Sequence, residues 1–192
     1  VGQFETDVRI DDWLNRIWLE GMGGRNDGES YGLALYFMAH HTVHDRWDLR
    51  RRRGHLFLTG DECPHPVVSG SAIRRFIGDE VADQPLEAVI RGVQRMYDFY
   101  FLHVNTYTAG AQGSLEVWRR AAPECVVQLA DPSAVCETIS MVGARGEGGL
   151  GDRAIGAGVG LLGGPAGVLL GRGSVAAYNG ALSKASQSML TY

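Results

Sequence analysis

Apolar residues recur in two alternating patterns along the first 147 residues. Short continuous apolar runs, typical of buried strands, lie at 55–59, 99–104 and 125–129. Apolar residues at helical spacing lie between and around them, at 8–18, 33–38, 72–77, 86–96, 115–120 and 133–141. Strands separated by helices need crossover connections, which indicates parallel pairing. We therefore expect an α/β fold: a mostly parallel, Rossmann-like three-stranded sheet flanked by helices on both faces.

The composition changes near residue 148. Thirteen of the 27 glycines lie between residues 143 and 173, and no Asp or Glu follows residue 152. We expect an α/β domain at 1–147 and a Gly/Ala-rich tail at 148–192, in which 175–185 has the pattern of a terminal helix. The stretch 154–171 is uncharged, but its many glycines favour a loosely packed tail over a membrane span.

Net charge and cysteine content limit the classes of protein to which the chain can belong. The chain has 18 Lys and Arg against 22 Asp and Glu, a formal charge of −4, whereas nucleic-acid binders are usually basic. Three scattered cysteines form neither a disulfide framework nor a CxxC metal site, which indicates a reducing compartment. We therefore expect a cytoplasmic protein that binds neither nucleic acid nor membrane.

Ligands of parallel α/β sheets bind beyond the carboxyl ends of the strands. After the run 55–59 come Asp61 and Glu62, two adjacent carboxylates that can bind Mg²⁺ or start a solvated loop. The glycine-rich loop 21–30 offers further oxygens from Asp27 and Ser30. Either residue can equally cap the helix that follows.

Two segments of the chain resemble a known family. The motifs GGRNDGESYGLALYF (residues 23–37) and GHLFLTGDE (54–62) resemble the C-terminal half of a bacterial von Willebrand factor type A (VWA) domain, within a match over residues 1–141. Such domains build a metal-ion-dependent adhesion site from three loops. The resemblance implies that Asp61, Ser30 and Asp27 are the metal ligands present here.

The chain departs from the VWA pattern in two places. The third loop reads Thr59-Gly60-Asp61, where the family has Thr-Asp-Gly, and the Asp-x-Ser-x-Ser of the first loop occurs nowhere. The resemblance therefore implies a partial domain and an incomplete adhesion site. The first three strands and the main metal loop would precede residue 1, and Mg²⁺ would bind only in the full-length protein.

The resemblance implies a protein-binding module rather than an enzyme, with an AAA-type ATPase as one class of partner. No GxSxG or P-loop motif is present. The alternative is a metal-dependent hydrolase that uses Asp61 and Glu62. His40 and His44 have the spacing of two zinc ligands, and Arg50 to Arg53 form a basic run; for both we favour a solvated segment.

We expect the 192-residue chain to bind Mg²⁺ weakly or not at all. Mg²⁺ needs several well-placed oxygens, and fixing a glycine-rich loop costs about 1–2 kcal/mol per residue. Calorimetric titration of the wild type and of Asp61→Ala measures this directly. A micromolar affinity that Asp61→Ala abolishes would contradict the expectation.

Overall fold

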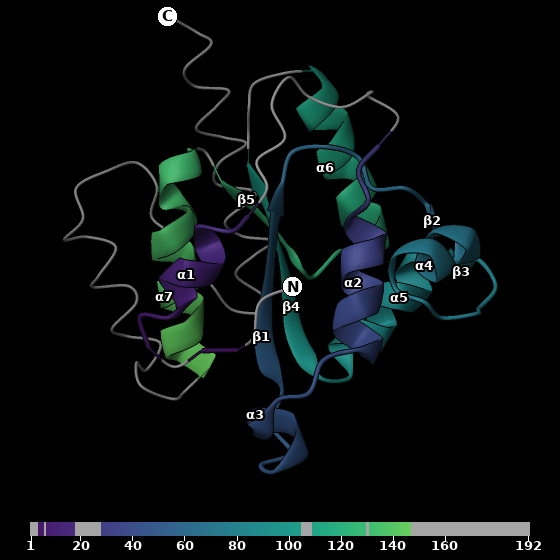
Figure 1. Ribbon diagram of the computed structural model, residues 1–192. Helices are drawn as coiled ribbons and strands as arrows, with labels where there is room; N and C mark the ends of the chain where they lie inside the picture. Colours follow the sequence, from purple (N-terminus) through teal and green to yellow (C-terminus); the bar gives the residue numbers. More distant parts are fainter. Residues whose placement is uncertain (1–3, 6, 18–27, 105–108, 130, 147–192) are drawn as a thin grey trace, which may run out of the picture.

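A parallel sheet between two layers of helices forms the described part of the chain (Figure 1). The computed structural model describes residues 4–5, 7–17, 28–104, 109–129 and 131–146. The sheet has three strands in the order β1-β4-β5: β1 (Gly54–Gly60), β4 (Tyr97–Val104) and β5 (Val126–Leu129). Both pairings are parallel, as the alternation of helices and strands predicts.

The helices connect the strands and cover both faces of the sheet. In Figure 1, α2, α5 and α6 lie on one side, and α1 and α7 lie on the other. The helices are α1 (Ile10–Leu14), α2 (Tyr31–His40), α3 (Asp45–Asp48), α4 (Gly70–Phe76), α5 (Leu86–Gln94), α6 (Ala109–Ala121) and α7 (Val135–Gly146), with a 3₁₀ turn at Pro132–Ala134. No described helix is long and apolar enough to cross a membrane.

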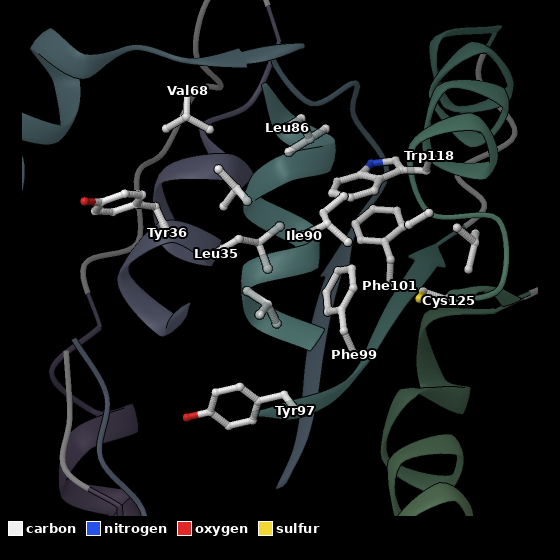
Figure 2. Close-up of a cluster of buried hydrophobic side chains, with 14 of the residues drawn as sticks. Leu35, Tyr36, Val68, Leu86, Ile90, Tyr97, Phe99, Phe101, Trp118 and Cys125 are labelled. Carbon is white, nitrogen blue, oxygen red and sulfur yellow. The ribbon is translucent and has the colours of Figure 1, made fainter. Parts of the chain in front are cut away.

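The larger core lies between the sheet and the α2, α5 and α6 layer (Figure 2). Alternate side chains of β4, among them Phe99 and Phe101, point into it together with Trp118 of α6. Phe101 and Trp118 stack with ring centroids 3.8 Å apart. The amphipathic helix α5 adds four buried apolar side chains: Leu86, Val89, Ile90 and Val93.

A smaller core fills the opposite face of the sheet. Leu102, Val127 and Leu129 are fully buried there against Val142 of α7. Phe57 of β1 and Tyr100 of β4 stack at its margin, with ring centroids 5.3 Å apart. Because β4 is apolar on both faces, it is the buried centre of the sheet.

The expected α/β class, the three parallel strands and the helices on both faces are confirmed. The expected helix at 8–18 is wrong in extent. The described helix α1 covers five residues, and Val8, Ile10 and Leu14 are exposed. Helical spacing of apolar residues did not lead to burial there. Two elements were not expected: α3, and a small antiparallel pair between β2 (Val67–Val68) and β3 (Gln84–Pro85).

The tail at 148–192 and the domain boundary near 148 lie outside the described residues. Asp27, most of the glycine-rich loop 21–30 and the residues that directly follow β4 lie outside them too.

Trp118→Ala should lower the free energy of unfolding by about 3–5 kcal/mol, the usual loss for a large buried aromatic side chain. Trp118 is fully buried and packs on Phe101. Urea denaturation followed by circular dichroism measures the change. Trp47→Ala, at a half-buried position in α3, is the control and should lose much less. A loss below about 1 kcal/mol for Trp118→Ala would contradict this description of the core.

Candidate functional site

The segment that follows β1 is fixed by hydrogen bonds to its backbone. The Ser114 hydroxyl of α6 donates to the carbonyl oxygen of Asp61 at 2.5 Å. The Trp118 indole N–H donates to the carbonyl oxygen of Glu62 at 3.2 Å. Both donors lie one turn apart on α6, so this helix holds two consecutive peptide groups at the carboxyl end of β1.

A buried histidine completes this contact. Nε2 of His103, near the end of β4, lies 2.8 Å from the Ser114 hydroxyl oxygen, and both side chains are fully buried. Ser114 has one hydroxyl proton, and when this proton is donated to the Asp61 carbonyl, Nε2 of His103 is the donor in the second bond. In this arrangement the pair joins β1, β4 and α6.

A second backbone connection joins the loop before α2 to the same segment. The Glu29 N–H donates to the carbonyl oxygen of Cys63 at 2.8 Å, and the His65 N–H donates to that of Glu29 at 3.4 Å. Glu29 and Pro64 form an isolated parallel bridge. The structure thus brings together the two loops that the sequence predicted to share a site.

Tyr31, the first residue of α2, lies beneath the two loops. Its ring makes edge-to-face contacts with Phe101 and Trp118, at centroid distances of 5.8 and 5.5 Å. Its hydroxyl group passes so close to Gly60 that a Cβ atom there would lie 2.2 Å from the hydroxyl oxygen. A side chain at position 60 would therefore force Tyr31 to shift.

The ionisation of Tyr31 reflects the charge around it. Burial raises the pKa of the Tyr31 hydroxyl above its usual value, and a backbone hydrogen bond with Glu62 acts in the opposite direction. The negative charges of Glu29, Asp61 and Glu62 each raise this pKa further. The end of the sheet is therefore acidic, and the tyrosine stays neutral at physiological pH.

Two of the three predicted metal ligands can be placed. Asp61 follows β1 and is half-buried, and Ser30 occupies the position before α2 without a capping hydrogen bond from its side chain. Asp27 lies outside the described residues. Among the described residues, no group of three or more His, Cys, Asp or Glu side chains could hold a metal ion. Of the three predicted ligands, the described residues thus supply one carboxylate and one hydroxyl, and the site of Asp61, Ser30 and Asp27 remains a prediction.

The predicted zinc spacing does not lie on one helix. Helix α2 ends at His40, and His44 instead precedes α3, where its Nδ1 accepts a hydrogen bond from the Trp47 N–H at 3.3 Å. The basic run Arg50 to Arg53 directly precedes β1, as expected for a connection into this strand. Arg53 pairs with Asp98 of β4 at 2.8 Å.

The residues that hold the site were not singled out from the sequence. Ser114, Trp118 and His103 carry no motif. Trp118 and His103 fall inside segments predicted only as a helix and a strand, and Ser114 directly precedes the predicted helix at 115–120. One signal was available, because His103 is the single histidine in the apolar stretch 99–104. A buried polar side chain needs a hydrogen-bond partner, and that partner stabilises the site.

Comparison of the chain with protein-family models, with curated proteins and with solved structures finds no match. The resemblance to VWA domains therefore stays a prediction, and the function is argued from the geometry of the site.

Ser114→Ala should lower the free energy of unfolding by about 1–3 kcal/mol, because it leaves a buried imidazole N–H without its acceptor. The matched control is Ser140→Ala. Ser140 is exposed on α7, and its hydroxyl donates to the carbonyl oxygen of Cys136 at 2.9 Å. The control should change stability by less than about 0.5 kcal/mol in urea denaturation. Equal effects of the two substitutions would show that the buried network does not stabilise the loop.

Proposed function

We propose that this chain is a protein-binding module whose docking face is the carboxyl end of the parallel sheet. One observation carries the proposal: the backbone of the segment after β1 is fixed, while its carboxylates are unused. The carbonyl groups of Asp61 and Glu62 accept hydrogen bonds from α6. No ion pair or hydrogen bond joins either carboxylate to another described residue.

A fixed backbone with unused charged groups suits recognition. Binding normally costs free energy for ordering loops and side chains, and a segment that is already held reduces this cost. Glu29 is exposed on the adjoining loop, so the acidic surface extends across both loops. Acidic side chains around a rigid end of a sheet favour a partner segment that carries Lys or Arg.

The resemblance to VWA domains supports the same class of function. In that family a metal ion on the corresponding loops captures a carboxylate of the partner, and AAA-type ATPases are frequent companions. Asp61 and Ser30 are the described residues that would hold Mg²⁺ in that mode. Direct contact with a basic partner needs no further ligands, so the proposal stands on the described residues alone.

The main alternative is a metal-dependent hydrolase that uses Asp61 and Glu62. Two adjacent carboxylates at a strand end can hold a hard cation, which can activate water. An assay of metal-dependent turnover separates the two functions, because only the hydrolase would give turnover.

A displayed peptide library selected on the purified chain should enrich Lys- and Arg-rich sequences. Calorimetry with the selected peptides should show affinity that falls about tenfold in the double variant Asp61→Asn/Glu62→Gln, because two charged contacts are lost. The matched control is Glu116→Gln, an exposed carboxylate on α6 that should leave affinity unchanged.

The same proteins are then assayed against phosphate-ester, carboxylic-ester and peptide substrates with Mg²⁺ or Mn²⁺. The proposal expects no turnover. Metal-dependent turnover that Asp61→Asn abolishes would establish the hydrolase instead. Selected peptides that bind the double variant as tightly as the wild type would place the docking face elsewhere.

A further inference from the structure

Strand β1 has a neighbour on one side only among the described residues. The Gly54 N–H donates to the Met96 carbonyl at 2.9 Å, which fixes the direction of the backbone groups along the strand. Because these groups alternate, the N–H and C=O of His55, Phe57 and Thr59 point away from β4. No described residue hydrogen-bonds to these outward backbone groups.

This edge lacks the features that usually prevent pairing with another chain. Edge strands are commonly protected by Lys, Pro, a bulge or an inward-pointing charge. The strand Gly54–Gly60 has no charged residue and no proline, and all seven of its residues pair in continuous register with β4. It therefore offers a straight row of donors and acceptors.

A half-buried histidine on β1, His55, also lacks a hydrogen-bond partner among the described residues. Both ring nitrogens of His55 are buried, and neither has a hydrogen-bond partner among the described residues. Buried polar atoms are almost always hydrogen-bonded in native proteins.

The two ends of β1 carry opposite charge. Arg50 to Arg53 precede the strand, and Asp61 and Glu62 follow it. If a second copy pairs with β1 in the antiparallel direction, the basic end of each strand lies beside the acidic end of the other. Parallel pairing would place like charges together, which is unfavourable. The charges thus favour a second copy of this chain as the partner of β1, paired in the antiparallel direction.

We propose that β1 pairs with β1 of a second copy of this chain, antiparallel and centred on Phe57. In this register Phe57 lies opposite its own copy, and His55 lies opposite Thr59 of the other chain. Side chains directly opposite in an antiparallel pair share one face, so the exposed Thr59 side chain of the other chain lies beside His55. At each end of the paired strands, Arg52 of one chain lies nearest Glu62 of the other chain.

The dimer would join two small sheets into one continuous sheet of ordinary size. Each copy contributes three parallel strands, whereas sheets commonly have about 4–6. The inference goes beyond the proposed function, since it concerns the edge of β1 and not the capture of a basic peptide. A monomer that still binds the selected peptides overturns the dimer alone. Because Arg52 of the second copy would lie nearest Glu62, peptide binding is measured on the Arg52→Glu variant as well. A wild-type dimer together with an Arg52→Glu variant that binds none of the peptides overturns the proposed function alone.

Charge reversal tests the partner and the direction of pairing. Sedimentation equilibrium should show a dimer for the wild type, with dissociation constants at least about tenfold higher for Arg52→Glu and for Glu62→Arg, because each creates like-charge contacts at both ends. Mixing these two variants should restore a heterodimer of wild-type affinity, since every contact again joins opposite charges. Arg74→Glu, at an exposed position on α4, is the control and should leave the dimer unchanged.

Hydrogen exchange tests whether the outer edge of β1 is the surface through which the two copies pair. In the dimer, the amides of Phe57 and Thr59 should become protected as protein concentration rises, whereas those of Leu56 and Leu58 should be protected at every concentration. A monomeric wild type, or mixed variants that stay monomeric, would overturn the proposal. So would a dimer in which the Phe57 amide exchanges freely, because its contact would lie elsewhere. Protection of that amide in a monomer would show that the edge is covered within one chain.

Discussion

The burial of β4 between two layers of helices is the constraint on which the rest of the structure depends. Phe99 and Phe101 fill the core beneath α5 and α6, and Leu102 fills the core beneath α7. His103 lies in the same strand and is equally buried, so its imidazole needs a polar partner. That requirement leads to Ser114 and through it to the backbone of Asp61.

The polar contact has a consequence at the surface. By holding the peptide groups after β1, α6 fixes the position of two carboxylates without using their charge. Trp118 contributes both to the core and to the loop after β1, because its ring fills the core and its N–H donates to the Glu62 carbonyl. Packing and the candidate docking face are therefore coupled through one helix.

The sequence predicted most of the fold because burial and periodicity decide it. The apolar runs at 55–59, 99–104 and 125–129 are short and flanked by helical spacing, and each became a parallel strand. The segment at 8–18 has apolar residues at helical spacing, but its described helix is short, and Val8 and Leu14 are exposed. The periodicity of apolar residues indicates which residues share a face of a helix, but it does not indicate whether another element covers that face.

The position of the candidate site was predictable from the sequence, but the side-chain contacts that hold it were not. The rule for parallel sheets placed Asp61 and Glu62 at the carboxyl end of a strand, and the structure puts them there. Backbone hydrogen bonds join Glu29 to Cys63 and His65, which follow them. The contacts of Ser114 and His103 depend on residues far apart in sequence, which no local pattern specifies. His44 shows the same limit, because a helix end at His40 removed it from the predicted helical face.

The central claim is that buried contacts from α6 hold the segment after β1 rigid while its carboxylates face a partner. Backbone ¹⁵N relaxation of the amides of Asp61, Glu62 and Cys63 tests this most directly. The account predicts order parameters of about 0.85, the value of rigid backbone, in the wild type and a clear decrease in Ser114→Ala. Values below about 0.6 in the wild type, or no change in the variant, would contradict it.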